Sequence, residues 1–157
     1  MKICIIGGDG FIGQWVVNEL LLRGHSVVVI GRSNEPKFAM KNTEYVSSNY
    51  EHQTKIRSVL ERVDGLIHLA YSTIPSTSMT DPSLDFTTNV LPSVTLFQEA
   101  SEIGLGKLLF VSSGGTVYGD VEALPIDENS TTNPISSYGI SKLAIERYAD
   151  MFYRLKG

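Results

Sequence analysis

Short apolar runs alternate with amphipathic segments along most of this chain. The apolar, β-branched runs are of strand length and predict five buried strands, at Lys2–Ile6, Ser26–Ile30, Glu44–Ser47, Gly65–Ala70 and Lys107–Ser112. A helical spacing of apolar positions predicts four helices, at Phe11–Arg23, Thr54–Arg62, about Leu84–Ile103 and Ser137–Lys156. Pro92 is compatible with the third helix only near a helix start or at a kink.

The alternation of strands and helices predicts an α/β fold, with a doubly wound parallel sheet and helices on both of its faces. Sheets of this kind bind ligands beyond the carboxyl ends of their strands. Every glycine-rich or hydroxyl-rich stretch of this sequence follows a predicted strand. We therefore expect the functional site to lie at that edge of the sheet.

Composition narrows the class of protein. A chain of 157 residues with 42% hydrophobic content can bury one core, so we expect one domain. The net charge of −4 and the absence of like-charge blocks give no footprint for nucleic acid or a membrane surface, and no apolar run could span a bilayer. The lone Cys4 excludes an internal disulfide framework and, without a signal peptide, indicates the cytoplasm. The three histidines are far apart, so no metal site is expected.

Three glycines separate the first predicted strand from the first helix, in the stretch GGDGFIG. Gly7 permits a tight turn, Gly10 lets the backbone approach a pyrophosphate, and Gly13 lets the helix pack close to the strand. The N-terminus of the helix offers free N–H groups to phosphates. In this context the spacing predicts a dinucleotide site rather than an ordinary turn, and we assign Phe11 and Ile12 to it as well.

The end of the second strand bears on the type of dinucleotide. An acidic residue usually stands there and binds the 2′-hydroxyl of the adenosine ribose. This chain instead reads Ile30-Gly31-Arg32-Ser33. Arg32 is either a partner for a 2′-phosphate, which favours NADP, or a solvated loop residue. NAD and NADP both stay open as the cofactor.

Tyr138 and Lys142 are four residues apart, on one face of the last predicted helix. A free phenol has a pKa of about 10 and is a poor base at neutral pH, but a neighbouring ammonium and an oxidised nicotinamide stabilise the phenolate. Such a tyrosine can take a proton from an alcohol while hydride moves to the nicotinamide. The alternative is a Tyr–Lys pair on a helix surface.

These motifs, together with His68-Leu69-Ala70, Asn89 and the stretch SSGGTVYG from Ser112, resemble the extended short-chain dehydrogenase/reductase superfamily. Within it, the chain is most similar to the NAD-dependent epimerase/dehydratase family, in order along nearly its whole length. The resemblance implies that residues 1–157 form a Rossmann-like NAD(P)-binding domain. It places Leu69 and Ala70 on the adenine-ribose and pyrophosphate side, Asn89 in a helix behind the cofactor, Ser112 near the nicotinamide, and Lys142 within reach of the nicotinamide ribose.

The chain departs from the family at two further positions. Asn49 stands where the family has an aspartate near adenine, and its amide can still form a hydrogen bond. Gly114 stands where the family has its catalytic serine or threonine. Thr116 is our preferred replacement, and Ser113 is the other candidate, although alternation along the strand would point it away. A third possibility is that neither hydroxyl takes over the role.

The same stretch favours one reaction. Gly115 and Thr116 occupy the places of the Asp–Glu pair that similar sugar 4,6-dehydratases use, which argues against dehydration. A 4-epimerase needs only the tyrosine, the lysine, one hydroxyl and the cofactor. We therefore expect a nucleotide-sugar epimerase that acts on a UDP-sugar. The alternatives are an NADP-dependent nucleotide-sugar reductase and a non-catalytic NAD(P)-binding sensor or scaffold.

Members of the family are longer than this chain and continue into a smaller lobe that binds the nucleotide sugar. We therefore expect the 157 residues to be part of a longer protein. Alone they should bind cofactor poorly, turn over hardly any substrate and leave Lys107–Ser112 as an exposed sheet edge. The resemblance also implies a possible homodimer of the full-length protein, while the sugar stays unspecified.

Overall fold

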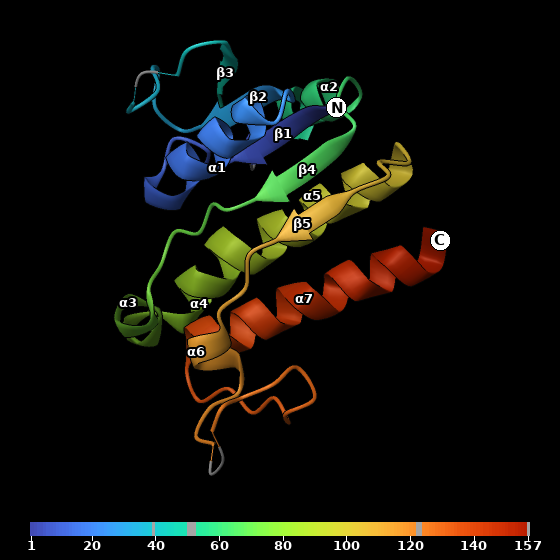
Figure 1. Ribbon diagram of the computed structural model, residues 1–157. Coiled ribbons are helices and arrows are strands. Elements are labelled where there is room, and N and C mark those ends of the chain that lie inside the picture. The colour runs from blue at the N-terminus through green and yellow to red at the C-terminus, as the bar shows by residue number, and fades with distance from the viewer. Residues whose placement is uncertain (39, 50–52, 122–123, 157) are drawn as a thin grey trace. The chain divides into compact units, whose positions relative to one another are not determined.

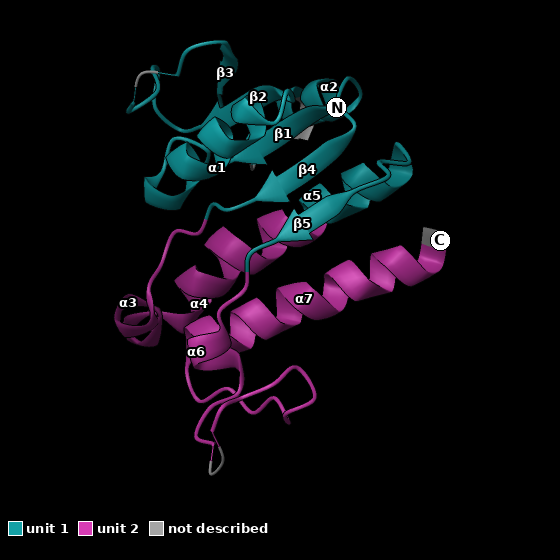
Figure 2. Ribbon diagram, viewed as in Figure 1, with its two compact units in different colours: residues 1–70, 95–111, 156 teal, residues 71–94, 112–155, 157 magenta. Residues whose placement is uncertain are grey.

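The computed structural model describes residues 1–38, 40–49, 53–121 and 124–156, in two compact units (Figure 2). Unit 1 comprises residues 1–70, 95–111 and 156, and unit 2 comprises residues 71–94 and 112–155. In chain order (Figure 1) the elements are β1 (Lys2–Ile6), α1 (Phe11–Leu22), β2 (Ser26–Gly31), β3 (Thr43–Ser47), α2 (Gln53–Leu60), β4 (Gly65–His68), α3 (Pro75–Thr80), α4 (Pro82–Asp85), the π-helix η1 (Phe86–Val90), α5 (Leu91–Glu102), β5 (Leu108–Phe110), α6 (Gly114–Val117) and α7 (Ser137–Lys156).

Unit 1 is built on a five-stranded sheet of order β3-β2-β1-β4-β5. All four neighbouring pairs are parallel, and β1 runs in register with β2 from Lys2 opposite Ser26 to Ile6 opposite Ile30. The order reverses at β1, so β1 is the central strand and the carboxyl ends of all the strands share one edge. The prediction of a doubly wound parallel sheet is confirmed.

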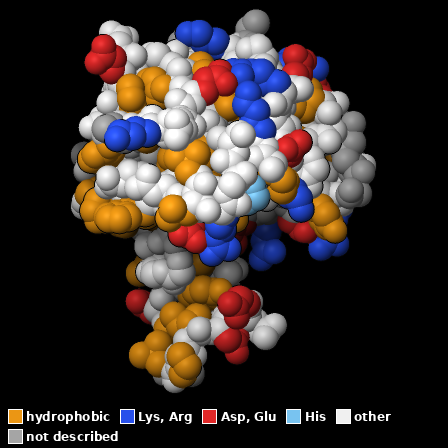
Figure 3. All heavy atoms as spheres, turned by 45° about the horizontal axis from the view of Figure 1, so that its top comes forward, with side chains coloured by type: hydrophobic (Ala, Val, Ile, Leu, Met, Phe, Trp, Pro, Cys, Tyr) orange, Lys and Arg blue, Asp and Glu red, His pale blue; other side chains and the backbone are white. Residues whose placement is uncertain are grey.

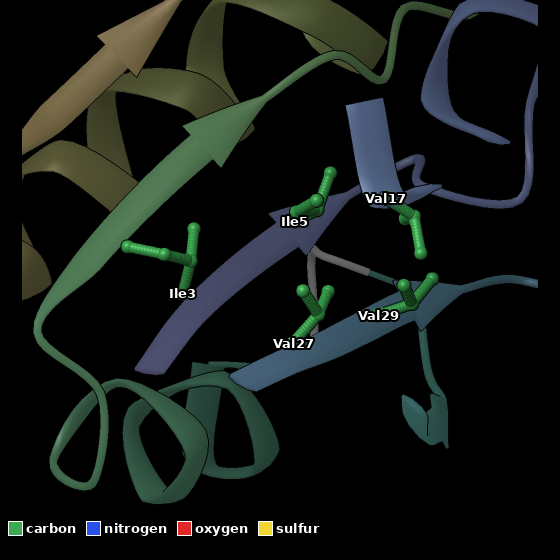
Figure 4. Packing of buried hydrophobic residues seen from close by; sticks show 5 residues of the cluster. All are labelled: Ile3, Ile5, Val17, Val27 and Val29. Carbon is green, nitrogen blue, oxygen red and sulfur yellow. The ribbon is translucent and has the colours of Figure 1, made fainter. Parts of the chain in front are cut away.

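One face of the sheet packs against α1 (Figure 4). Alternate residues of a strand point to opposite faces, so the odd-numbered positions of β1 and β2 lie together. They form a cluster with one residue of α1, and its members are Ile3, Ile5, Val17, Val27 and Val29. At roughly 25 cal/mol per Å² of buried apolar surface, such a cluster is a main source of this unit's stability.

The opposite face carries the even-numbered positions and packs against α5. His68 of β4 is fully buried there, with its ring 6.1 Å from that of Phe97 and 5.6 Å from that of Phe110. Arg57 of α2 donates to Glu99 of α5 at 2.6 Å, which ties these two helices together. Helices therefore cover both faces of the sheet within unit 1, as predicted.

Charged side chains of both signs are interspersed on the face seen in Figure 3. In unit 1, Glu44 of β3 accepts hydrogen bonds from Arg62 and from Lys2. The hydrogen bond from Arg62 is the main reason why the pKa of Glu44 falls from 4.5 to about 2. No helix among the described residues is long and apolar enough to cross a membrane.

The regular elements of unit 2 are all helices, and they depart from the expected ones in two respects. The single long helix expected from about Leu84 is divided by η1, where the N–H of Leu91 donates to the carbonyl of Phe86, five residues earlier. Pro92 then lies in the first turn of α5, a position that needs no N–H donor. The short helices α3 and α6 were not predicted.

Candidate cofactor and catalytic sites

The glycine-rich loop joins β1 to α1 in unit 1, at the carboxyl edge of the sheet. Gly7 has a φ of +81°, and the N–H of Gly10 closes the turn on the carbonyl of Gly7 at 3.0 Å. A Cβ atom on Gly13 would lie 2.6 Å from the Cα atom of Gly8, so only glycine allows the helix this close to the loop. The loop therefore has the tight turn and the close packing that a pyrophosphate site needs.

The first turn of α1 is open to an anion. Its N-cap residue, Gly10, provides no side-chain cap, and no acidic side chain lies in the first turn. The orphan N–H groups of a helix start favour a negatively charged ligand. Phe11 and Ile12 begin the helix, and they are 81% and 58% exposed.

The residues after β4 lie beside this loop. Leu69 and Ala70 both donate backbone hydrogen bonds to the carbonyl of Ile6, at 2.9 and 3.1 Å. A Cβ atom on Gly7 would come within 2.9 Å of the backbone nitrogen of Ala70. The structure thus brings together two segments that were assigned to the nucleotide from separate motifs.

Two other residues assigned to the cofactor follow neighbouring strands. Arg32 comes directly after β2, where its side chain is exposed and makes no hydrogen bond or ion pair with another described residue. Asn49 follows β3 and is partly buried, and its carbonyl accepts a hydrogen bond from the Ser48 hydroxyl at 3.1 Å. Both residues therefore lie beyond the carboxyl ends of their strands.

An unpredicted contact joins the glycine-rich loop to the end of β2. Asp9 is 6% exposed, and the Tyr45 hydroxyl lies 3.4 Å from its Oδ2 atom. The same hydroxyl donates to the carbonyl of Ser33 at 3.0 Å. Burial and the Asp9 carboxylate raise the pKa of Tyr45, in that order, so this phenol stays protonated and can donate.

Tyr138 and Lys142 lie on α7 in unit 2, as the four-residue spacing predicted. The Lys142 ammonium lies 5.6 Å from the centre of the Tyr138 ring and 4.0 Å from the centre of the Tyr71 ring. Tyr71 and Tyr138 meet edge to face, with their ring centres 4.9 Å apart. The cluster therefore consists of two phenols and one ammonium, and Tyr71 is a member that the motif did not reveal.

Burial shapes the proton affinities of this cluster. Desolvation lowers the pKa of Lys142 from 10.5 to about 8, although the charges of Asp85 and Glu146 act in the opposite direction. Burial and the charge of Asp85 also raise the pKa of Tyr138, and the nearby Ser113 side chain partly offsets this. At neutral pH Lys142 is therefore mostly protonated, and its proton is held far less tightly than that of an exposed lysine.

A fully buried carboxylate, Asp85, anchors the start of α7. It accepts hydrogen bonds from the hydroxyls of Ser141 at 2.6 Å and Ser137 at 3.2 Å, and from the hydroxyl of Thr73. Ser141 lies between Tyr138 and Lys142 in sequence, so this network orients the helix turn that carries both. Asp85 was not predicted, because a single aspartate in a helical segment has no distinguishing pattern.

Asn89 lies in η1 and is fully buried. Its side-chain oxygen accepts from the backbone N–H of Ser72 at 2.7 Å, and its amide group donates to the carbonyl of Asp85 at 3.0 Å and to the hydroxyl of Thr73 at 3.2 Å. Asn89 therefore fixes the segment after Tyr71 to the helix. Its position in a helix agrees with the expectation from the family.

The hydroxyl-rich stretch that starts at Ser112 forms the short helix α6 and the two residues before it. Ser113 is the N-cap residue of α6, and its nearby side chain lowers the pKa of Tyr138. The Thr116 hydroxyl instead donates to the carbonyl of Ser113, at 3.2 Å. Gly114 is exposed, and a Cβ atom there would meet nothing within 4 Å. Ser112 is partly buried, and its hydroxyl has no partner among the described residues.

The remaining candidate ligands make no further site. Burial raises the pKa of the Cys4 thiol to about 12, which makes it an unreactive core residue. Among the described residues, no group of three or more His, Cys, Asp or Glu side chains is arranged to hold a metal ion.

Curated relatives match nearly the whole chain. It is 32% identical over 163 residues to a UDP-glucose 4-epimerase of Lacticaseibacillus casei, an alignment that covers 99% of this chain and 49% of that protein. It is 33% identical over 155 residues to a dTDP-4-dehydro-6-deoxyglucose reductase of Escherichia coli, covering 93% of this chain and 49% of that protein. The chain thus spans about half the length of the curated relatives that it matches.

Solved structures agree with the sequence matches. The crystal structure of a UDP-glucose 4-epimerase of Thermotoga maritima with UDP-glucose superposes with a TM-score of 0.92 at 31% identity, covering 100% of this chain and 52% of that one. The UDP-glucose 4-epimerase of Thermus thermophilus in complex with NAD gives the same TM-score and coverage at 30% identity. The model of the NAD dependent epimerase/dehydratase family matches residues 3–157, and the chain belongs to that family.

Proposed function

We propose that this protein is an NAD(P)-dependent nucleotide-sugar epimerase, and that it inverts C4 of a UDP-sugar. The observation that carries the proposal is the cluster of buried Lys142 with the partly buried Tyr138 and Ser113 in unit 2. The family supports it, because relatives at about 32% identity are UDP-glucose 4-epimerases. The domain assignment of residues 1–157 to cofactor binding is part of this proposal.

The described residues fit a dinucleotide cofactor. The glycine cradle at Gly7, Gly10 and Gly13 would hold the pyrophosphate, since a Cβ atom at Gly13 would meet the loop at 2.6 Å. The exposed side chains of Phe11 and Ile12 would lie against it. When bound, the nicotinamide supplies a reversible hydride acceptor. The neighbouring assignments of Arg32, Asn49, Leu69, Ala70, Asn89 and Ser112 belong to the same proposal.

Tyr138 would exchange a proton with the sugar hydroxyl at its Oη atom. Burial and, to a smaller extent, the charge of Asp85 raise its pKa, so the phenol needs positive charge and hydrogen-bond donors nearby in order to act as a base. Lys142 supplies the charge: its pKa of about 8 leaves it mostly protonated at pH 7, at 5.6 Å from the Tyr138 ring. Desolvation makes that charge more effective than it would be in water.

The effect of the Ser113 side chain on the pKa of Tyr138 favours Ser113 as the hydroxyl that replaces the family's serine or threonine at Gly114. Thr116 was preferred from sequence, but its hydroxyl already donates within α6. We therefore expect Ser113→Ala to lower kcat by about 10²-fold, an effect of the size found for a lost active-site donor, and Thr116→Val to leave it within about twofold. A larger loss of kcat in Thr116→Val than in Ser113→Ala would identify Thr116 as the catalytic hydroxyl.

Interconversion of UDP-glucose and UDP-galactose by the full-length protein tests the proposal. Tyr138→Phe should lower kcat by about 10²–10⁴-fold, the usual contribution of a general base. Tyr153→Phe is the matched control, because that phenol is 74% exposed on the same helix. Equal losses in the two variants would contradict the assignment of Tyr138.

The same assay separates the alternative functions. The match to a dTDP-4-dehydro-6-deoxyglucose reductase makes a nucleotide-sugar reductase the second candidate. A reductase would consume NADPH in proportion to substrate and would not interconvert the two UDP-sugars. Cofactor binding without turnover of any sugar in a nucleotide panel would instead indicate a sensor or scaffold.

A further inference from the structure

β2 ends without an acidic residue, and the side chain of Asp9 lies beside that strand end instead. In dinucleotide sites the residue that ends β2 is commonly an acid that binds the adenosine ribose, and here it is Gly31. A Cβ atom built on Gly31 would lie 2.9 Å from both Cγ and Oδ1 of Asp9. The Tyr45 hydroxyl lies closer still, so the carboxylate of Asp9, in the glycine-rich loop, and this hydroxyl together occupy the volume that a side chain at position 31 would otherwise enter.

The Asp9 carboxylate is held there rather than free to swing away. Asp9 is 6% exposed, and its Oδ2 atom lies 3.4 Å from the Tyr45 hydroxyl, whose single proton is shared between this oxygen and the nearer carbonyl of Ser33. Its Oδ1 atom accepts no hydrogen bond from any described residue. One carboxylate oxygen thus faces the Tyr45 hydroxyl, and the other keeps its capacity to accept from a ligand.

Resting on the proposed function, we infer that Asp9 binds the ribose hydroxyls of the adenosine half of the cofactor and thereby selects NAD over NADP. A carboxylate oxygen accepts hydrogen bonds from the 2′- and 3′-hydroxyls of a ribose. The 2′-phosphate of NADP would place a second negative charge against it, and like charges a few ångströms apart repel strongly in a partly buried site. Arg32, the residue that favoured NADP, is exposed and has no partner among the described residues to fix it toward a phosphate.

Separate titrations of NAD⁺ and NADP⁺ into the full-length protein, followed by calorimetry, test this inference. The wild type should bind NAD⁺ at least about tenfold more tightly than NADP⁺. Asp9→Asn should weaken NAD⁺ binding about tenfold and leave NADP⁺ binding equal or tighter, because the amide keeps the shape and removes the charge. Asp64→Asn is the matched control. Its carboxylate accepts from the backbone N–H of Lys2 at the opposite end of the strands, so it should keep the wild-type ratio.

A second variant changes the geometry without touching a charge. In Gly31→Ala the added methyl group would collide with the Asp9 carboxylate and the Tyr45 hydroxyl, and the displaced carboxylate should lower the preference for NAD⁺. A wild type that prefers NADP⁺, or an Asp9→Asn variant that folds and keeps the wild-type ratio, would overturn the inference and leave the proposed function intact. Failure of the wild type to bind either dinucleotide would overturn both.

Discussion

Replacing Lys142 by methionine should stabilise the protein at neutral pH, even though it removes a proposed active-site charge. A pKa lowered from 10.5 to about 8 corresponds to about 3 kcal/mol of unfavourable free energy for the buried ammonium at pH 7, at about 1.4 kcal/mol per pH unit. The cation–π contact of the ammonium with the Tyr71 ring, at 4.0 Å, stabilises the folded protein by about 1–2 kcal/mol and offsets part of this. Lys142→Met should therefore raise the free energy of unfolding by about 1–2 kcal/mol.

The pH dependence makes this prediction specific. Between pH 8 and 10.5 the unfolded chain binds more protons at Lys142 than the folded chain, so the wild type gains stability as the pH rises. From pH 7 to 9.5 the gain is about 2 kcal/mol, and the methionine variant lacks it. Urea denaturation of both proteins at the two pH values, followed by circular dichroism, measures the difference. The exposed Lys41→Met provides the control, and a Lys142→Met difference that does not change with pH would refute the reasoning.

Three further substitutions test other parts of the structure. Asp85→Ala should lower the free energy of unfolding by about 3–5 kcal/mol, since it leaves buried donors unsatisfied, and a loss below about 1 kcal/mol in chemical denaturation would contradict this. Gly13→Ala should cost about 1–3 kcal/mol and weaken dinucleotide binding by calorimetry, whereas Gly106→Ala, where a Cβ atom meets nothing, should do neither. Gly114→Ser should leave the thermal midpoint unchanged, because the added side chain also meets nothing. Introduced into the Ser113→Ala variant, it should restore turnover. A kcat that stays low in the double variant would argue against position 114 as the site of the catalytic hydroxyl.

The fold was largely predictable because β1, β2 and β4 are buried on both faces and therefore read as continuous apolar runs. The restriction on Pro92 was also informative: the proline lies in the first turn of α5, directly after η1. The short helix α6 was not predictable, because four residues, Gly114 to Val117, contain too little periodicity and two poor helix formers. Its formation depends on packing instead, since a Cβ atom on Gly139 would lie 2.6 Å from the carbonyl oxygen of Thr116.

The site was predictable only where its residues are close in sequence. The Tyr138–Lys142 pair follows from helix geometry, whereas Asp85 reaches Ser141 across 56 positions and has no local signature. The orientation expected for Ser113 assumed a strand that continued through it. The strand ends at Phe110, so alternation no longer decides where that side chain points.

The π-helical segment at residues 86–90 also governs which insertions and deletions this region can accept. A π-turn accommodates one residue more than an α-helical turn, and each residue of an α-helix adds about 100° of rotation. Removal of a single residue from the segment would restore a regular helix and turn Asp85 by about that angle relative to Ser93, whose hydroxyl donates to the carbonyl of Asn89 at 2.6 Å. Asp85 could then no longer meet Ser141, so the length of this short segment is as much a constraint as the identity of its residues.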